Sequence, residues 1–259
     1  MNKQEELKKN GFLLIKNFFS VSDVETVFND IKEIFTIQFI YCGFIMSGDE
    51  IKTQKEFDSY VYKLYEYDYK RFLNVGKNLQ HIISLYKLSM SEKIISLLQE
   101  FGLSFPNICT RPVLHFNQRK IATKSFYYKT PIHQDWGNMQ GSSDSLVLWT
   151  PFVNIFDELG PLEFIPMSHK DGLMDGHFIE GGFWKPNKIY KEEEWAQAKL
   201  NKGDLLIFSS FLVHRSGDNI SDCIRWSTHW RYNNLNDTTF IERGFISPYK
   251  YIPADKLEH

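Results

Sequence analysis

The chain changes character near residue 103, and this change limits the folds open to it. Before that point apolar residues recur mostly at helical intervals, whereas after it short apolar runs of strand length alternate with turn residues. The strand-like runs cover residues 111–116, 145–152, 162–165, 204–208 and 224–232. Many short strands at this spacing favour a β-sandwich or barrel, with the preceding helices packed on the outer face of one sheet. We therefore expect a mainly β fold with flanking helices.

Within the first 102 residues the pattern predicts two well-defined helices and one strand. Residues 22–25, Ser-Asp-Val-Glu, have the spacing of a capping box, and apolar residues follow at helical intervals as far as Phe35. Ser91 is placed to cap a second helix, and Gly102 is placed to end it. Residues 11–16 form a short apolar strand candidate.

The chain is long enough to bury one large core. It has 259 residues, of which 42% are hydrophobic and 16% aromatic, and all-β chains of this length often form single domains. A high aromatic content suits a packed barrel with a shaped interior. We expect one domain over residues 1–256, with a helical part at about 1–102 and a β core at about 103–250. Residues 257–259 are expected to be the remnant of an expression tag.

Charge, cysteines and hydropathy argue against several classes of function. The net charge is −2, so no overall field exists to attract nucleic acid. Cys42, Cys109 and Cys223 form no C-x-x-C pair and indicate no disulfide framework. No apolar signal core follows Met1, and the longest near-apolar stretch, 35–46, is too short to cross a bilayer. We expect a cytoplasmic protein that binds neither nucleic acid nor membranes, and the sequence leaves its oligomeric state open.

Three residues have the arrangement of a metal site. His133 and Asp135 are two positions apart in a segment that we expect to be a strand, where such residues project to one face. His214 follows a second strand-like run. Two histidines and one carboxylate on one face of an octahedral metal leave the opposite face open for a chelating cosubstrate and dioxygen. Taken alone, the H-x-D pair is equally well read as a hydrogen-bonded core histidine beside a turn aspartate.

The residues after His214 favour the metal site. A dicarboxylate that chelates iron through one end needs a cation for its other carboxylate, and arginine suits this because its planar fork binds both oxygens. Arg225 follows His214 in a strand-like segment, and Ser216 offers a hydroxyl donor. The alternative for Arg225 is an ordinary surface ion pair.

With these motifs in place, the chain resembles the phytanoyl-CoA dioxygenase family of iron(II)- and 2-oxoglutarate-dependent oxygenases over nearly its whole length. The matching segments are the opening strand at 10–19, His-Gln-Asp at 133–135, Leu-Trp-Thr-Pro at 148–151, the Gly-Pro-Leu to Ser-His-Lys stretch at 160–170, and His214, Ser216 and Arg225. In the 160–170 stretch, Met167 replaces the family's usual glycine. These motifs in this order are highly specific.

The resemblance implies a double-stranded β-helix, or jelly roll, with N-terminal helices packed on one sheet. It implies that His133, Asp135 and His214 hold iron(II). Arg225 and Ser216 would hold the C5 carboxylate of 2-oxoglutarate, and Trp149 would line the pocket for this cosubstrate.

Two further polar residues are weighed against structural roles. Asn117 belongs to the strand before the His-Gln-Asp motif, where it could point toward the cosubstrate or be a core polar residue. His169 falls at a position that is structural in the family that the chain resembles.

The implied reaction is hydroxylation of an unactivated C–H bond in a small molecule, consuming dioxygen and releasing succinate and carbon dioxide. Asp135 favours this over halogenation, because related halogenases lack this carboxylate. Desaturation, cyclisation and epimerisation need the same triad and stay open. Two other classes of protein are alternatives. The first is a cupin-type metalloenzyme that does not use 2-oxoglutarate, and Arg225 argues against it because such an enzyme needs no cation there. The second is a non-catalytic binding module, and the complete triad argues against it because such a module could lose part of the triad.

The sequence does not identify the substrate. The basic and aromatic residues of segment 119–129 could meet an anionic substrate, or form an ordinary solvated loop. The glycine-bearing stretch at 168–202 is a candidate lid, because so long a connection in a compact domain is usually functional.

Overall fold

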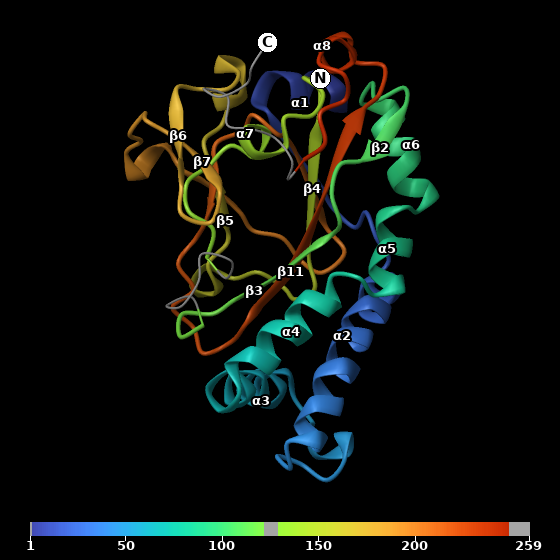
Figure 1. Ribbon diagram of the computed structural model, residues 1–259, viewed down its shortest axis with the longest axis vertical. Coiled ribbons are helices and arrows are strands. Elements are labelled where there is room, and N and C mark those ends of the chain that lie inside the picture. Colours follow the sequence, from blue (N-terminus) through green and yellow to red (C-terminus); the bar gives the residue numbers. More distant parts are fainter. Residues whose placement is uncertain (1, 122–128, 249–259) are drawn as a thin grey trace.

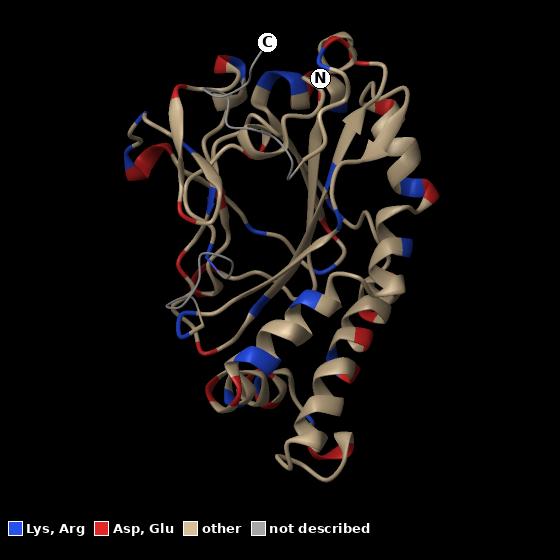
Figure 2. Ribbon diagram, viewed as in Figure 1, with Lys and Arg blue, Asp and Glu red and all other residues tan. Residues whose placement is uncertain are grey.

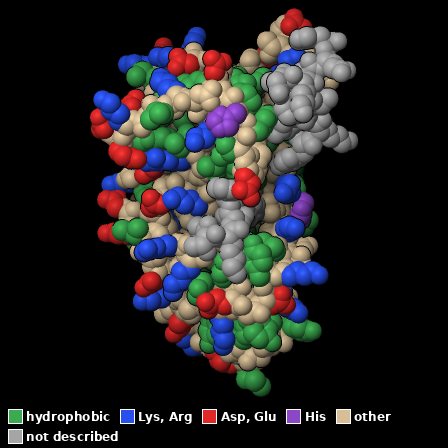
Figure 3. All heavy atoms as spheres, turned by 60° about the vertical axis from the view of Figure 1, so that its left-hand side comes forward, with side chains coloured by type: hydrophobic (Ala, Val, Ile, Leu, Met, Phe, Trp, Pro, Cys, Tyr) green, Lys and Arg blue, Asp and Glu red, His purple; other side chains and the backbone are tan. Residues whose placement is uncertain are grey.

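The computed structural model describes residues 2–121 and 129–248, so most of the basic segment 119–129 lies outside the described residues. A layer of helices lies against a larger β structure (Figure 1). Lysine and arginine are interspersed with aspartate and glutamate along the outer helices and loops (Figure 2) and over the face shown in Figure 3. None of the described helices is long and apolar enough to span a membrane.

The helical layer comes mainly from the first hundred residues, as expected. The helices are α1 (Lys3–Asn10), α2 (Val21–Tyr41), α3 (Gln54–Tyr67), α4 (Tyr69–Leu79), α5 (Ile83–Ser89), α6 (Glu92–Glu100), α7 (Asp135–Met139) and α8 (Thr238–Glu242), with short 3-10 turns η1 (Gly48–Glu50), η2 (Asp157–Leu159), η3 (Ser168–Asp171) and η4 (Glu192–Glu194). The expected start of α2 was two residues late, because Ser20 is its N-cap and the Ser20 hydroxyl accepts from the Asp23 amide at 3.1 Å. Ser91 is the N-cap residue of α6 as predicted, although its hydroxyl makes no capping hydrogen bond, and the C-cap is Phe101, directly before Gly102.

The β structure consists of one large sheet, one small sheet and a hairpin. The large sheet has the order β1 (Phe12–Ile15), β9 (Leu205–Ser209), β4 (Leu146–Pro151), β11 (Arg225–Asn234) and β2 (Pro106–Ile108), and β3 (Val113–Asn117) also pairs with β11. The small sheet has the order β10 (His214–Ser216), β5 (Leu162–Phe164) and β8 (Ala196–Ala198), and the hairpin joins β6 (Gly176–Ile179) to β7 (Phe183–Pro186). All these strand pairs are antiparallel.

Side-chain alternation gives the large sheet two apolar faces. On the outer face, Trp226 of β11 packs against Phe35 of α2 and Phe57 of α3, with ring centroids 5.8 Å apart in both pairs. On the inner face, Trp149 of β4 belongs to a second apolar cluster with Phe164 of β5. The helices therefore cover one side of the large sheet, and the small sheet faces its other side, as expected for a jelly roll.

The stretch at 168–202, expected to be an irregular lid, contains regular structure. It includes η3, the β6–β7 hairpin, η4 and strand β8. Met167, just before it, has a φ of 64°, the left-handed region where glycine is favoured. The replacement of the family's usual glycine therefore places a strained residue at this turn, where the Met167 amide donates to the Asn10 carbonyl at 2.8 Å.

Candidate active site

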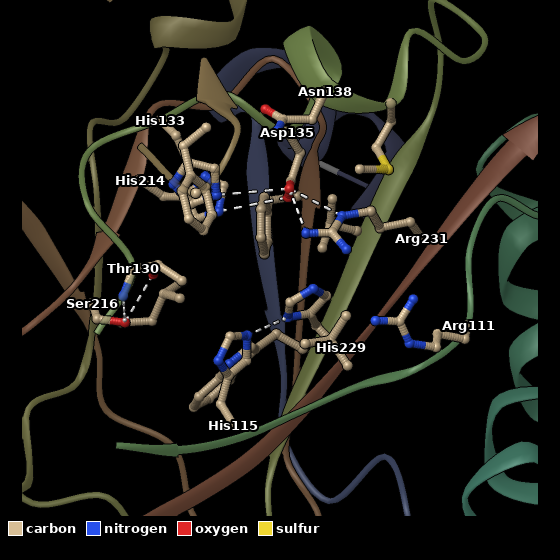
Figure 4. A pocket seen from close by; sticks show the side chains of 18 of the residues that line it. Arg111, His115, Thr130, His133, Asp135, Asn138, His214, Ser216, His229 and Arg231 are labelled. Atoms are coloured by element: carbon tan, nitrogen blue, oxygen red, sulfur yellow. Dashed lines mark hydrogen bonds and ion pairs between the residues drawn. The ribbon is translucent and has the colours of Figure 1, made fainter. Parts of the chain in front are cut away.

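Backbone pairing brings the two histidines of the predicted triad together. His133 and His214 form an isolated antiparallel bridge, in which each amide donates to the other's carbonyl at 3.0 and 3.1 Å. Their rings lie side by side, with centroids 4.1 Å apart. The expectation that His133 and Asp135 share a regular strand was wrong, because Asp135 is the first residue of helix α7. The helix start still turns the carboxylate toward the same point as the two imidazoles (Figure 4).

The three side chains converge on one buried point. Nε2 of His133 lies 3.7 Å from Oδ1 of Asp135, and Nε2 of His214 lies 3.6 Å from Oδ2. One candidate ligand atom from each residue can be chosen so that all three lie within 4.8 Å of one another. All three residues are buried. Two imidazoles and one carboxylate at this spacing make a donor set for a divalent transition metal.

Backbone carbonyls fix the orientation of both imidazoles. Nδ1 of His133 is 2.8 Å from the Pro131 carbonyl, and Nδ1 of His214 is 2.9 Å from the Leu212 carbonyl. A carbonyl only accepts, so each Nδ1 carries the proton and donates it, which leaves the lone pair on Nε2. Both Nε2 atoms therefore face Asp135 in the form that binds a metal.

Arg231 of β11 holds the carboxylate of Asp135. Its Nε and Nη2 donate to Oδ1 at 3.0 and 2.6 Å, whereas Oδ2 is buried and has no hydrogen-bond partner among the described residues. Burial opposes ionisation of Asp135, but Arg231 and the two imidazoles outweigh it and hold the pKa of this carboxyl well below its usual range. Burial lowers the pKa of His214 to about 3, with a further contribution from His133. Asp135 is therefore anionic and His214 neutral at pH 7.

The predicted cosubstrate anchors lie in the same cavity as the triad. Arg225 is 1% exposed, and its Nη1 and Nη2 donate to the Gly160 carbonyl and, at 3.2 Å, to the Ser216 hydroxyl. Its Nε is buried and has no hydrogen-bond partner within the part of the chain that the structure describes. Burial lowers the pKa of Arg225 to about 10, which leaves it protonated at neutral pH. Trp149 lies beside it, with the guanidinium carbon 5.9 Å from the ring centroid.

The backbone conformation at Gly160 brings two loops close together at the end of the cavity that contains Arg225. Gly160 has a φ of 71°, and a side chain there would meet the backbone of the loop that contains Gly217. The Ser216 hydroxyl is 2.9 Å from the hydroxyl of Thr130, which also lines the cavity. The Gly-Pro-Leu motif of the sequence thus brings a carbonyl close enough to accept from Arg225.

One cavity of about 250 Å³ joins these groups. Its lining includes the triad, Arg225, Ser216 and Trp149, all predicted from the sequence. In Figure 4, His133, His214, Thr130 and Ser216 lie on the left, Asp135 lies near the middle and Arg111 lies on the right. Sequence reasoning missed other lining residues, among them Gln80, Arg111, Phe183, His229 and Arg231.

Strand register could have identified two of the missed residues. Arg225, His229 and Arg231 are separated by even numbers along β11, so they project to the same face. Once Arg225 is placed inside the barrel, the other two follow. His229 is buried in the cavity wall.

Asn117 and His169, the two polar residues weighed above, lie outside the described cavity lining, and so does Trp136, which follows Asp135. The Asn117 amide donates to the Gly217 carbonyl at 3.3 Å, in a structural contact of the barrel wall. Nε2 of His169 lies 3.1 Å from the Lys8 carbonyl, in agreement with its expected structural position. Trp136 stacks on Phe211 with centroids 5.2 Å apart.

The β6–β7 hairpin covers part of the cavity. The Phe183 ring packs edge-on against His133, with centroids 4.9 Å apart. The buried side chain of Gln134, between His133 and Asp135, links these residues to the stretch that contains the hairpin. Its Nε2 donates to the Gly172 carbonyl at 2.8 Å and to the Phe211 carbonyl at 2.6 Å. Gly137 of α7 has no room for a side chain, because an added Cβ would lie 2.3 Å from Trp184. The predicted lid is thus packed directly on the triad.

Comparison with known proteins places these features in one family. The phytanoyl-CoA dioxygenase (PhyH) family model matches residues 7–227. The peroxisomal phytanoyl-CoA dioxygenase of Bos taurus is 23% identical over 237 residues, which cover 88% of this chain and 67% of that protein. The Homo sapiens enzyme is 24% identical over 223 residues, which cover 82% of this chain and 62% of that protein. The chain thus spans about two thirds of the length of these relatives.

Solved structures support the jelly-roll fold. A crystal structure of the epimerase SnoN in complex with Fe3+, alpha ketoglutarate and nogalamycin RO has a TM-score of 0.56 to this chain at 16% identity, covering 89% of this chain and 82% of that one. This likeness confirms the expected fold class. Because the family model covers most of the sequence, the chain belongs to the phytanoyl-CoA dioxygenase family of iron(II)- and 2-oxoglutarate-dependent oxygenases.

Proposed function

We propose that the protein hydroxylates an unactivated C–H bond of a small-molecule substrate, using dioxygen and 2-oxoglutarate and releasing succinate and carbon dioxide. One observation supports this most strongly. The three candidate ligand atoms lie within 4.8 Å of one another, and a buried arginine without an ion-pair partner among the described residues lines the same cavity. A metal and a dicarboxylate would satisfy both groups at once.

The donor set fits iron(II) on the protein's side. Both imidazoles have their Nε2 lone pairs free, and Oδ2 of Asp135 is buried without a partner. A buried carboxylate oxygen without a partner costs free energy, and a bound cation would remove that cost. His133, Asp135 and His214 would hold the metal, and their arrangement at one end of the cavity leaves space beside it.

Arg225 fits the distal carboxylate of 2-oxoglutarate. A buried guanidinium is unfavourable unless an anion neutralises it, and the described residues supply none within ion-pair distance. Its unpartnered Nε and the Ser216 hydroxyl offer donors at one place. Trp149 would lie along the cosubstrate, and Thr130 would support Ser216.

The protein's own residues would position and shield the reacting groups. When bound together, iron(II) and 2-oxoglutarate would activate dioxygen, which is the oxidant for C–H cleavage, and 2-oxoglutarate would be oxidised to succinate and carbon dioxide. Arg231 fixes the carboxylate of Asp135, while the Pro131 and Leu212 carbonyls fix the imidazoles. Phe183 and Phe208 pack edge-on against His133 and His214, which keeps water from their sides. Such preorganisation determines which C–H bond lies within reach.

The alternatives differ in what they require of these residues. Halogenation would need Asp135 to be absent. A cupin-type enzyme that ignores 2-oxoglutarate leaves the buried charge of Arg225 unexplained, and a non-catalytic binding module leaves the complete triad unexplained. Desaturation, cyclisation and epimerisation use the same residues, so hydroxylation is proposed as the default outcome. The cytoplasmic location and the absence of nucleic-acid and membrane partners stay predictions.

Substitutions at the two groups separate metal binding from cosubstrate binding. His133→Ala and His214→Ala should abolish succinate formation, because two ligands do not hold iron facially. Arg225→Ala should mainly raise the KM for 2-oxoglutarate, and Arg225→Lys should raise it less. Arg119→Ala, at an exposed arginine outside the cavity lining, serves as the control. Unchanged 2-oxoglutarate dependence in Arg225→Ala would remove this residue from the site.

A further inference from the structure

Four residues of the cavity lining have a buried side-chain atom without a hydrogen-bond partner among the described residues. These atoms are Oδ2 of Asp135, Nε of Arg225, Oε1 of Gln80 and Nε2 of His229. Native proteins rarely leave buried polar atoms unsatisfied, so several of them around one cavity indicate groups that a ligand contacts. Iron(II) and 2-oxoglutarate would satisfy the atoms of Asp135 and Arg225. The atoms of Gln80 and His229 are left for a third molecule.

Gln80 brings a hydrogen-bond acceptor to the cavity from the helical layer. It is the C-cap residue of α4, is 1% exposed and lines the cavity. Its Nε2 lies 3.3 Å from the Gly76 carbonyl. Because a carbonyl only accepts, the nitrogen of the amide and not its oxygen must face Gly76. Oε1 is therefore the atom that can accept a hydrogen bond from another molecule.

His229 brings one ring proton to the same cavity from the large sheet. Its Nδ1 lies 3.2 Å from Nε2 of His115 on β3, and both histidines are buried in the cavity wall (Figure 4). Burial, followed by Arg231 and His115, lowers the pKa of His229 well below its usual value, so its ring is neutral and carries a single proton. When Nδ1 accepts from His115, that proton is on Nε2, which can then donate to a ligand.

A hydroxyl is the ligand group that matches this acceptor and this donor together. It can donate to Oε1 of Gln80 and accept from Nε2 of His229. A carboxylate only accepts, so it would leave Oε1 of Gln80 unsatisfied. An ammonium group only donates and needs a nearby anion, whereas the one carboxylate in the described lining, that of Asp135, is bound by Arg231.

Apolar side chains adjoin both this polar pair and the triad. Val113 of β3 is the register partner of His229 and lines the cavity. Phe183 of the β6–β7 hairpin also lines it and packs edge-on against His133. The whole cavity, which 2-oxoglutarate would share, is about 250 Å³. A further ligand therefore needs a small and mainly apolar skeleton.

We propose that the substrate is a small, mainly apolar alcohol, whose hydroxyl lies between Oε1 of Gln80 and Nε2 of His229. This inference rests on the proposed function, because it assigns to the substrate the part of the cavity that the metal and 2-oxoglutarate leave. The skeleton extends from the hydroxyl toward the triad, so a C–H bond and not the hydroxyl lies beside the metal. Gln80 and His229 thus select the substrate and set its orientation.

Binding to a complex that cannot turn over tests the inference. The protein is loaded with zinc(II) and 2-oxoglutarate, and hexanol, cyclohexylmethanol and benzyl alcohol are each compared with their methyl ethers by calorimetry. At least one alcohol should bind, and its ether should bind about tenfold more weakly, because the ether oxygen cannot donate to Gln80. The carboxylate and the amine with the same carbon skeleton should also bind more weakly than the alcohol.

Variants at the two residues should have different effects. Gln80→Met removes the acceptor at nearly constant side-chain length, so the alcohol should lose its advantage and the alcohol-to-ether affinity ratio should fall toward one. His229→Phe removes the donor to the ligand oxygen, so it should weaken alcohol and ether alike, by about tenfold, and keep their ratio. His229→Gln, which retains a donor, should recover part of this loss.

Matched variants on the same two elements are the controls. Asn78→Ala changes an exposed residue of α4, and Ser227→Ala changes a buried residue of β11 outside the described cavity lining. Both should keep the wild-type affinities for alcohol and ether. The variants of Gln80 and His229 should still bind 2-oxoglutarate as the wild type does, which shows that they fold.

The outcomes separate this inference from the proposed function. The inference alone is overturned if none of the alcohols binds, if alcohol and ether bind equally, or if the carboxylate or amine binds more tightly. An unaltered alcohol-to-ether ratio in Gln80→Met overturns it as well. Failure of the wild-type protein to bind 2-oxoglutarate with metal would instead overturn the proposed function.

Discussion

Asp135 has two oxygens with different surroundings, and this difference suits the metal-ligand role that we propose for it. Oδ1 accepts two hydrogen bonds from Arg231, while Oδ2 lies near Nε2 of His214 without a hydrogen-bond partner. The guanidinium thus fixes the plane of the carboxylate and keeps it ionised. Residues that orient a metal ligand in this way are often nearly as important for affinity as the ligand itself.

Arg231→Ala should therefore weaken metal binding by about 10–100-fold, the usual effect of losing such a partner. Arg231→Lys should recover part of the loss, because it restores the charge without the planar fork. Titration with iron(II) under anaerobic conditions measures this, with Arg119→Ala as the control. Wild-type affinity in Arg231→Ala would show that Asp135 needs no such support.

The sequence predicted the candidate site residues whose spacing is distinctive, and missed cavity residues whose position depends on strand register. His133, Asp135, His214 and Arg225 were identified because chemistry and motif agree. Arg231 looked like any strand arginine, since its role depends on which face of β11 points inward. The starting point of α7 at Asp135 could not be predicted either, because the turn is imposed by pairing between His133 and His214.

Strand β11 is the element that couples the helical layer to the cavity. Trp226 faces the helices, while Arg225 and Arg231 face the site. Asp58 of α3 fixes this contact, because it accepts from the Trp226 indole at 2.9 Å and from the Ile224 amide at 2.8 Å. Burial raises the pKa of Asp58 to about 6, although these hydrogen bonds oppose the rise.

Replacing Asp58 should destabilise the fold in a pH-dependent way. Asp58→Ala leaves two buried donors unsatisfied, at about 1–3 kcal/mol each. Because the folded pKa lies above the ordinary value of 3.8, Asp58 contributes most below about pH 4, and this contribution falls as the pH rises through 6. The gap in free energy of unfolding between wild type and variant should therefore narrow by about 1–3 kcal/mol between pH 4 and 7.

Denaturant unfolding at each pH measures this gap, and Asp49→Ala is the control because Asp49 is exposed. A gap that widened with rising pH would contradict the assigned role of Asp58.

At the element scale, periodicity predicted most of the framework. The expected strands correspond to β1, β3, β4, β5, β9 and β11 within one or two residues. The strands β2, β6, β7, β8 and β10 were missed, because none of them coincides with a clear apolar run and they are set by pairing with their neighbours, whereas the equally short β1 and β5 lie in apolar runs. The glycine-bearing stretch that was predicted to be a lid contains regular structure. Gly181 and Gly182, which have positive φ, form the turn of the β6–β7 hairpin.

For the whole molecule, the helices and the large sheet share one apolar core. A single cluster contains Phe35 and Phe72 of the helices together with Leu148, Trp226 and Trp230 of the sheet. Neither layer could bury its apolar face without the other. We therefore propose that residues 1–256 form one domain, which should unfold in a single transition by both fluorescence and circular dichroism. Separate transitions would divide the chain near residue 103.

The side chains at the metal end of the cavity and those at its rim come from different kinds of structure. Triad and anchor side chains come from paired backbone and from β11, whereas Arg111 and Phe183 come from the segment between β2 and β3 and from a hairpin. Variation at the rim can change the substrate while the metal and 2-oxoglutarate end is kept.

Anaerobic absorption spectroscopy of the protein with iron(II) and 2-oxoglutarate tests the central claim most directly. A chelate held by His133, Asp135 and His214 should give a weak visible metal-to-ligand charge-transfer band. The band should be absent in His214→Ala and should need more 2-oxoglutarate in Arg225→Ala. Iron-loaded wild-type protein that gives no band at saturating 2-oxoglutarate would contradict the account.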